Sequence, residues 1–362
     1  MLQKALALVL VVASVTSFSG CGSTANHYIY AALPAANQII AYREDPNSGV
    51  LTQIAGSPYT VGDGAISLAL HPSGKFLYAA NPGQNENDVS LFTIASNGVL
   101  TEVFPRTLVT PNASQPTLLR MDPAGNFLYV ANSGSLNISV FSIDSGTGAL
   151  TAVANSPVFV GAVPLNMQLT PSGNFLFVSI ASLSSGSIVG FSVNAGMLTR
   201  ASVTSTDGAN PNGLAVDPSG TFLYAANSGS NSVSIFSIDS TGTLTEVQGS
   251  PLAVGSVPVA LLLDPQGKFL YVANQAANNV AAYSINSSGL PNILTTSTTT
   301  GTFGTESSPA FLVADPSGKY LYIGNQGSSA GIQAFGVSSG NLTALATYGV
   351  GNTPSSIVVL GK

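Results

Sequence analysis

The sequence predicts an all-β fold, a seven-bladed β-propeller of four-stranded blades whose ring is closed by the C-terminal strand. Three observations predict it: one phrase recurs at a nearly constant spacing, each repeat contains four short apolar segments, and the two termini together complete one repeat. The composition agrees with this fold, since only 7% of the 362 residues are charged and 45% are hydrophobic. Such values, with many Gly, Ser, Thr and Asn residues, are typical of a turn-rich, well-buried β protein.

The repeated phrase is a Pro-x-Gly turn followed by an aromatic-rich strand. Its glycines are 47 to 51 residues apart and are Gly74, Gly125, Gly173, Gly220, Gly267 and Gly318. Propeller blades are roughly 40 to 50 residues long. The spacing therefore predicts one blade per repeat.

A seventh copy begins within the phrase at His27, with the aromatic strand but without the turn before it. Residues 353–360 match the strand that precedes the turn in the other copies. Pairing of the two termini would complete this blade and leave no open edge in the ring. We therefore expect a propeller over residues 27–362.

Each repeat is expected to hold four strands, which in the fifth copy are residues 213–217, 222–226, 232–238 and 244–247. The second of these is apolar on both faces, which is typical of a sheet covered on both sides. Stacked blades provide that cover.

The acids of the repeat look like a carboxylate set, but they precede Pro-x-Gly, where Asp is preferred by the turn itself. We interpret Asp122, Asp217, Asp264 and Asp315, and His71 at the same place, as turn residues. The asparagines that end the aromatic strands are interpreted as loop caps. They are Asn81, Asn132, Asn227, Asn274 and Asn325.

The N-terminus has the pattern of an export signal, with Lys4 before an apolar run that is too short to span a bilayer. The segment Phe18-Ser19-Gly20-Cys21 resembles a bacterial lipobox, which implies lipidation of Cys21 after removal of a signal peptide, residues 1–20. Residues 21–26 would then be a tether, and the protein would be exported and anchored to a bacterial membrane, on the periplasmic side or at the cell surface. The alternative is that Cys21, the single cysteine, is a free thiol.

The formal charge is −6, and removal of Lys4 with the leader makes the chain more acidic. The nine Lys and Arg residues are scattered along the sequence. We therefore expect no basic patch that would bind nucleic acid or an anionic membrane surface. We expect a monomer whose partner is a small molecule or an envelope component. We expect contact with a membrane only through the lipid.

The repeat as a whole carries a family resemblance. The strings Phe236-Ser237-Ile238-Asp239, Gly249-Ser250-Pro251 and residues 264–274, DPQGKFLYVAN, resemble the repeat of the seven-bladed lactonase family. That family includes propeller-type 6-phosphogluconolactonases and is similar to fungal carboxymuconate-lactonising propellers. The resemblance covers residues 27 to 361 and implies the fold. It implies function less directly, because one fold serves many chemistries.

The catalytic residues of that family do not carry over. Its enzymes commonly have an Arg-His pair on one inner strand and a Glu after the strand-ending Asn. No matching histidine exists here, since those positions hold Ser67, Leu118, Asn166, Gly213, Ala260, Phe311 and Ser356. The positions of the Arg and the Glu are also filled by other residue types.

Polar residues gather on two inner strands instead. Arg120 and Gln168 are two residues before the turn, and Asn166 is four before, so alternation places them on one face of neighbouring strands. On the channel side they would bind a carboxylate, a phosphate or a lactone carbonyl. The alternative is that Arg120 pairs with Asp122 or contacts channel water.

Acids cluster only in two loops, at residues 84–88 with Glu86 and at Thr305-Glu306, and neither has the spacing of a calcium loop. With His27 in what we expect to be an outer strand and His71 in a turn, we expect no catalytic triad, no metal site and no cofactor.

Two functions remain open from the sequence. The favoured one is a non-catalytic binding module with a diverged site. The alternative is a lactone hydrolase, in which Arg120 polarises the carbonyl and Glu86 or Glu306 activates water. A cavity that joins Arg120 to an acid would favour the enzyme.

Overall fold

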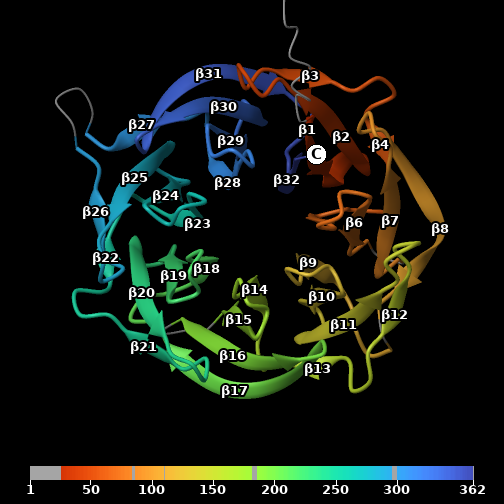
Figure 1. Ribbon diagram of the computed structural model, residues 1–362, viewed down its shortest axis with the longest axis horizontal. Helices are drawn as coiled ribbons and strands as arrows, with labels where there is room; N and C mark the ends of the chain where they lie inside the picture. Colours follow the sequence, from red (N-terminus) through yellow and green to blue (C-terminus); the bar gives the residue numbers. More distant parts are fainter. Residues whose placement is uncertain (1–25, 84–85, 110, 182–185, 296–299, 362) are drawn as a thin grey trace, which may run out of the picture.

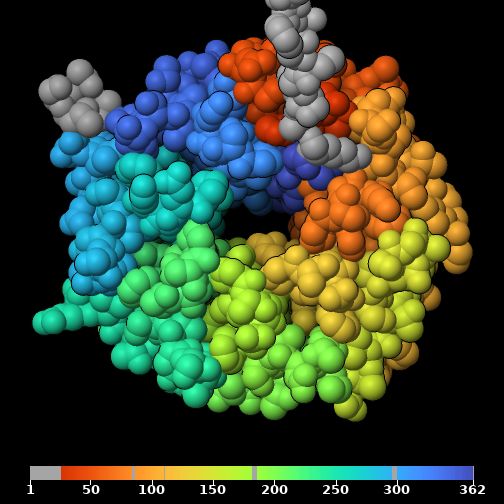
Figure 2. Space-filling model, in the orientation of Figure 1, coloured from red at the N-terminus to blue at the C-terminus, as the bar shows by residue number. Residues whose placement is uncertain are grey.

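The computed structural model describes residues 26–83, 86–109, 111–181, 186–295 and 300–361. Its strands form seven antiparallel sheets, which Figure 1 shows arranged radially as blades. The predicted seven-bladed propeller of four-stranded blades is therefore confirmed. Figure 2 shows the channel open at the centre of the face in view. The predicted signal peptide, Cys21 and residues 22–25 of the tether lie outside the described residues.

The strands repeat in the same order in each blade, from the channel outwards. The innermost strands are β32 (Ser356–Gly361), β5 (Ser67–Leu70), β9 (Pro116–Met121), β14 (Pro164–Leu169), β18 (Pro211–Val216), β23 (Pro258–Leu263) and β28 (Pro309–Ala314). The second, aromatic-rich strands are β1 (His27–Leu33), β6 (Phe76–Asn81), β10 (Phe127–Asn132), β15 (Phe175–Ile180), β19 (Phe222–Asn227), β24 (Phe269–Asn274) and β29 (Tyr320–Asn325). The third strands are β2 (Gln38–Glu44), β7 (Asp88–Ile94), β11 (Asn137–Ile143), β16 (Ser187–Asn194), β20 (Ser232–Ile238), β25 (Asn279–Ile285) and β30 (Gly331–Ser338).

The outermost position is filled in two ways. In three blades it is one long strand: β8 (Leu100–Leu108), β17 (Met197–Ser205) and β31 (Asn341–Gly349). In the other four it is divided into two short strands, a division that the sequence analysis did not predict. These pairs are β3 (Leu51–Gln53) with β4 (Tyr59–Thr60), β12 (Leu150–Ala152) with β13 (Val158–Phe159), β21 (Leu244–Glu246) with β22 (Leu252–Ala253), and β26 (Pro291–Ile293) with β27 (Thr302–Gly304). The one described helical segment is a 3₁₀ turn, η1 (Pro34–Ala36). Within the described ranges no helix is long and apolar enough to cross a membrane.

The two termini close the ring as predicted. β32 pairs with β1 in the first blade, from His27 opposite Gly361 to Ala32 opposite Ser356. β1 in turn pairs with β2, so it is the second strand from the channel. The expectation that His27 lies in an outer strand is therefore wrong, because β2 and β3 lie outside β1 in this blade.

The Pro-x-Gly turns have the hydrogen bonds of the predicted turn. In each of them the N–H of the glycine donates to the carbonyl of the first turn residue, as Gly220 does to Asp217 at 2.9 Å. The Asp217 carboxylate also accepts hydrogen bonds from the N–H groups of Thr221 and Phe222, both at 2.7 Å. The carboxylates of the turn acids thus accept hydrogen bonds from backbone N–H groups at the start of the second strand.

The strand-ending asparagines are buried and bond within their own blade. Asn132 donates to the side chains of Asn137 and Ser139, both at 2.9 Å, and Asn81 donates to Asp88 at 2.6 Å. Asn227 and Asn274 likewise join the end of the second strand to the start of the third, whereas Asn325 donates to the Ile323 carbonyl of its own strand.

Tyrosine hydroxyls link neighbouring blades. In four blades the tyrosine in the middle of the second strand donates to the carbonyl of a glycine in the next blade's outer hairpin. These pairs are Tyr30 with Gly98, Tyr78 with Gly148, Tyr224 with Gly289, and Tyr322 with Gly49, at 2.8 to 3.1 Å. Gly148 has φ +75°, and a Cβ there would lie 2.7 Å from the Phe76 ring, so this hairpin requires glycine.

Two equivalent tyrosines have no such bond, because the next blade has a shorter hairpin. The buried hydroxyls of Tyr129 and Tyr271 lack a hydrogen-bond partner among the described residues. The following blades use the two-residue turns Ala195-Gly196 and Ser339-Gly340, with positive φ at all four residues. We infer that these tight turns hold the glycine carbonyl away from the hydroxyl.

Candidate functional site at the channel mouth

The inner strands enclose a cavity of about 520 Å³ in one end of the channel. This volume lies within the range of roughly 300 to 1,000 Å³ that is usual for small-molecule sites. Apolar residues such as Leu118, Leu214 and Phe311 form most of its wall. Its polar lining residues are Ser67, Thr117, Arg120, Ser133, Asn166, Asn212, Gln326, Ser355 and Ser356.

Several of the polar groups in this cavity form hydrogen bonds between neighbouring blades. Ser67 accepts a hydrogen bond from the N–H of Leu119 at 3.0 Å, and Ser356 accepts one from the N–H of Leu68 at 3.1 Å. Gln326 donates to the carbonyl of Pro354 at 2.9 Å. These groups are therefore partly committed to neighbouring inner strands.

Arg120 is the one charged side chain among the described residues that line the cavity. Its guanidinium donates to the Leu119 carbonyl at 2.9 Å and to Asn166 Oδ1 at 3.3 Å. Because a guanidinium has five N–H donors, three remain for a ligand or water. Burial within the channel lowers the pKa of Arg120, which nevertheless stays protonated at neutral pH.

No carboxylate neutralises Arg120 among the described residues, where ion pairs involve only other groups. The nearest acid in sequence, Asp122, accepts a hydrogen bond from the N–H of Phe127 at 2.6 Å. The alternative in which Arg120 pairs with Asp122 is therefore not observed. A partly buried cation without a counter-charge attracts anions.

The structure brings together two of the three predicted ligand-binding residues. Asn166 accepts from Arg120 and donates through Nδ2 to the Asn212 carbonyl at 3.1 Å, so its amide is held in place. Gln168 lines a second cavity of about 410 Å³, which shares Leu214 and Leu261 with the first and extends to the turn residue Asp264.

The two candidate acids lie away from Arg120 and do not line its cavity. Glu86 pairs with Arg106 of β8 at 3.1 Å and accepts from the Asp63 N–H at 2.6 Å. Glu306 contacts Thr347 of the outer strand β31 at 3.5 Å. The structure therefore does not assemble Arg120 with Glu86 or Glu306. Among the described lining residues there is no Asp, Glu or His to act as a general base.

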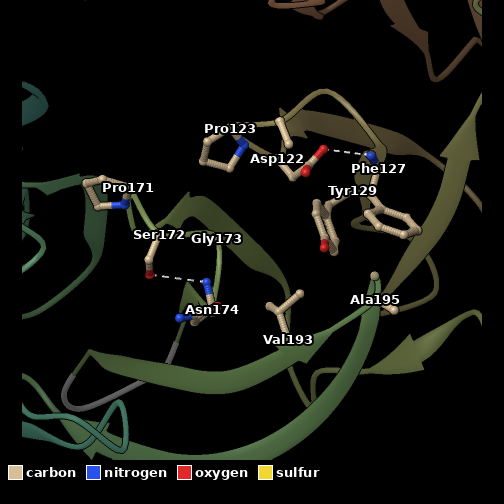
Figure 3. Close-up of a pocket in the computed structure, with 12 residues that line it drawn as sticks. Asp122, Pro123, Phe127, Tyr129, Pro171, Ser172, Gly173, Asn174, Val193 and Ala195 are labelled. Atoms are coloured by element: carbon tan, nitrogen blue, oxygen red, sulfur yellow. Dashed lines mark hydrogen bonds between the residues drawn. The ribbon is translucent and has the colours of Figure 1, made fainter. Parts of the chain in front are cut away.

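Another cavity, of about 470 Å³, lies between the third and fourth blades (Figure 3). It is bordered by two Pro-x-Gly turns and by the tight hairpin at Ala195, and Tyr129 contributes to its wall. Asp122 is oriented toward the Phe127 backbone. This cavity thus occurs where the shorter hairpin leaves Tyr129 without its bond to the next blade.

The histidines occupy different environments. His71 accepts or donates at both ring nitrogens, to Ser73 at 2.8 Å and to the Gly125 carbonyl at 2.9 Å, as expected of a turn residue. His27 lies beside two buried acids, Glu44 and Asp315. Ring closure brings these acids to His27, a grouping that the sequence analysis did not predict.

The sequence matches the family described as "Lactonase, 7-bladed beta-propeller" over residues 23–165, 164–261 and 253–359. A 6-phosphogluconolactonase of Formosa agariphila is 36% identical over 104 residues, which are 28% of this chain and 29% of that protein. One from Yersinia pestis is 30% identical over 97 residues, or 27% and 28% of the two chains. These matches span less than a third of the curated relatives' length.

Solved structures share the fold over almost the whole chain. A putative 6-phosphogluconolactonase of Bacteroides fragilis has a TM-score of 0.77 and 21% identity, and covers 93% of this chain and 98% of its own. The periplasmic gluconolactonase of Pseudomonas aeruginosa has a TM-score of 0.75 and 19% identity, and covers 93% and 99%. With the family match extending from residue 23 to residue 359, the chain belongs to the seven-bladed β-propeller lactonase family.

Proposed function

We propose that this protein is a binding module that takes a small carboxylate- or phosphate-bearing molecule into the channel mouth, where Arg120 holds the anionic group. The observation that carries the proposal is a guanidinium in a cavity of about 520 Å³, with no ion pair to any acid in the described part of the chain. Charge-assisted hydrogen bonds from Arg to carboxylate or phosphate are among the strongest in proteins. A sugar acid fits both the charge and the size.

The neighbouring groups would orient the ligand. Asn166 fixes one side of the guanidinium, and Thr117, Ser133 and Asn212 add hydroxyl and amide groups to the same cavity. Apolar walls reduce the local dielectric constant, which strengthens attraction of an anion to Arg120. The site therefore favours an anion with several hydroxyl groups over an uncharged sugar.

Lactone hydrolysis is the second candidate, and the family itself favours it. The curated relatives bear the name 6-phosphogluconolactonase, and a solved relative is a periplasmic gluconolactonase. In this alternative Arg120 polarises the lactone carbonyl and water attacks without a protein base. Since a positioned base contributes roughly 10² to 10⁴ in rate, turnover would be slow.

Binding is tested by isothermal titration with 6-phosphogluconate, gluconate and uncharged glucose. We expect the two anions to bind and glucose not to bind at the same concentrations. Loss of hydrogen bonds to a charged group costs about 1.5 to 3 kcal/mol, so Arg120→Met should weaken anion binding about 10- to 100-fold. Gln168→Met, in the second cavity, is the matched control. Equal binding by wild type and Arg120→Met would refute the proposal.

Hydrolysis is tested by the disappearance of 6-phosphogluconolactone near neutral pH, corrected for spontaneous opening. We expect little or no activity above background. Efficient turnover that Arg120→Ala abolishes, with Glu86→Gln unaffected, would instead make the channel an active site. Efficient turnover lost in both variants would support the alternative in which Glu86 activates water.

We further propose that the protein is exported and lipid-anchored through Cys21. The support is the apolar segment followed by Ser19-Gly20-Cys21 at the N-terminus. An anchored propeller would present its channel to solutes of the envelope. Its net negative charge would keep anions away from most of the surface, and Arg120 would provide a local exception.

A further inference from the structure

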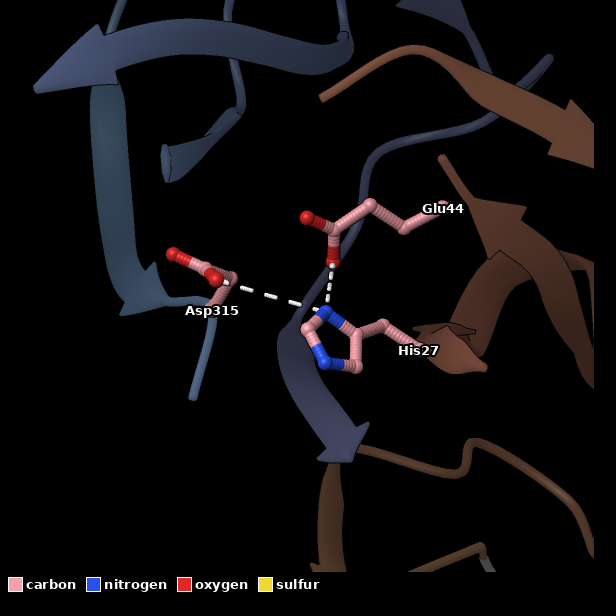
Figure 4. A group of neighbouring side chains, drawn as sticks. All are labelled: His27, Glu44 and Asp315. Atoms are coloured by element: carbon pink, nitrogen blue, oxygen red, sulfur yellow. Dashed lines mark ion pairs between the residues drawn. The ribbon is translucent and has the colours of Figure 1, made fainter. Parts of the chain in front are cut away.

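His27, Glu44 and Asp315 meet where the ring closes (Figure 4). His27 begins β1, Glu44 ends β2, and Asp315 follows β28 of the last blade. His27 Nδ1 lies 3.3 Å from Glu44 Oε2 and 4.0 Å from Asp315 Oδ2. All three residues are buried, with exposures of 6%, 1% and 1%. Figure 4 shows Nδ1 directed between the two carboxylates.

The propeller repeat does not require the Glu44 carboxylate. In each of the other six blades the residue that corresponds to Glu44 is aliphatic. Its N–H donates to the carbonyl of the residue just before the second strand. These residues are Ile94, Ile143, Val193, Ile238, Ile285 and Val337. Blade one therefore buries an acid where the fold accepts a hydrocarbon side chain, although burial of a carboxylate is costly.

Two of the three residues, His27 and Glu44, have buried polar atoms without a hydrogen bond in the part of the chain that the structure describes. Both carboxylate oxygens of Glu44 lack a hydrogen-bond partner among the described residues, and so does Nδ1 of His27. The Tyr322 hydroxyl lies beside Glu44 but donates to the Gly49 carbonyl at 3.1 Å. Two carboxylates face one imidazole, so a single positive charge does not neutralise the cluster.

We propose that His27, Glu44 and Asp315 bind a divalent transition-metal ion of the zinc type. One ligand atom from each residue lies within 4.8 Å of the other two. Ligand atoms about 2.1 Å from zinc are separated by about 3.4 Å at the tetrahedral angle, close to the His27–Glu44 distance. Two carboxylates and a neutral imidazole balance the dication, and the nitrogen ligand favours zinc over calcium or magnesium.

Hydrogen bonds already orient one of the ligands. Asp315 Oδ1 accepts from the Tyr320 N–H at 2.7 Å, and Ser317 donates to Oδ2. Such contacts around a ligand fix its direction and raise metal affinity. The ion would join the last blade to the first beside the β1–β32 pairing, and so would stabilise the closed ring by binding only the folded chain.

The test uses the purified protein after treatment with a chelator. Zinc titration, by calorimetry and against a chromophoric chelator, should give one tight site, and zinc should raise the midpoint of urea unfolding. Glu44→Gln and His27→Gln should each weaken binding by about 100-fold or more and remove the zinc-dependent shift. Glu44→Val, the residue of blades four and seven, should do the same while keeping the fold. His71→Asn controls for adventitious binding to histidine and should bind zinc as wild type does.

Substitution of cobalt for zinc tests the ligands independently. The visible spectrum of the cobalt-bound wild type should show a site of nitrogen and oxygen donors, and Glu44→Gln should lose this spectrum. Absence of zinc binding by the wild type would overturn the proposal. So would equal affinity in wild type, Glu44→Gln and His27→Gln, or a site selective for calcium or magnesium.

Discussion

The tyrosine links between blades predict opposite effects for the same substitution at equivalent positions. Tyr78 and Tyr129 are both fully buried in the middle of their second strands. The Tyr78 hydroxyl donates to the Gly148 carbonyl at 2.8 Å, whereas the Tyr129 hydroxyl has no partner among the described residues. Tyr78→Phe leaves a buried carbonyl unsatisfied and should cost about 1 to 3 kcal/mol of unfolding free energy. Tyr129→Phe removes a buried unsatisfied hydroxyl and should be neutral or stabilising, by up to about 1 to 3 kcal/mol.

Equilibrium urea unfolding followed by far-ultraviolet circular dichroism measures both effects, and is suited to a chain without tryptophan. The unfolding free energies of the two variants should differ by at least about 1 kcal/mol, seen as a difference in urea midpoint at an unchanged denaturant slope. Tyr224→Phe should behave as Tyr78→Phe does, since Tyr224 bonds to Gly289 at 2.9 Å. Tyr271→Phe should follow Tyr129→Phe. If Tyr129→Phe destabilises the protein as much as Tyr78→Phe, the reasoning about the short hairpins is wrong.

Further predictions concern a buried acid, the ring closure and the N-terminus. Burial raises the pKa of Asp88, so the folded state favours the protonated acid. The contribution of Asp88 to stability is therefore full below its unfolded pKa and is lost as pH rises through its folded pKa. Asp88→Asn, which introduces the residue found at the equivalent positions Asn137 and Asn279, should raise the urea midpoint at pH 7 but not near pH 3. The reverse change, Asn137→Asp, should lower it at pH 7, and a gain from Asp88→Asn that persists at acid pH would contradict the argument. Deletion of residues 353–362 removes β32, in which Ile357 and Leu360 are buried. This deletion should lower the unfolding free energy by at least about 3 to 6 kcal/mol. An unchanged melting temperature would contradict the pairing of the termini. Labelled palmitate should enter the wild type in a bacterial host but not Cys21→Ser, and equal labelling of the two would refute lipidation.

Most of the fold followed from the sequence because repetition makes the same pattern visible many times. The Pro-x-Gly turns marked the start of six of the seven second strands, and residues 353–360 matched the missing inner strand. The divided outer strands were missed because segments such as Leu252–Ala253 are two residues long and carry no periodicity of their own. The shorter hairpins at Ala195-Gly196 and Ser339-Gly340 are visible in the sequence. Their effect on Tyr129 and Tyr271 depends on which blades are neighbours.

The site was predictable only in part. Alternation along β9 and β14 placed Arg120 and Asn166 on the channel face, where the structure joins them by a hydrogen bond. Alternation cannot show how deep each residue lies, so Gln168 was assigned to the same group although it lines the next cavity. The grouping of His27 with Asp315 was missed because 288 residues separate them and only ring closure brings them together.

The central claim is that the channel mouth binds an anionic ligand through Arg120, and a crystal structure with 6-phosphogluconate or gluconate at saturating concentration tests it most directly. The account predicts density for the ligand in the cavity that Arg120 and Asn166 line, with carboxylate or phosphate oxygens about 2.7 to 2.9 Å from the guanidinium nitrogens. Crystals of Arg120→Met under the same conditions should show none. A channel mouth without ligand in the wild type, or a ligand bound there in the same pose by Arg120→Met, would contradict the claim.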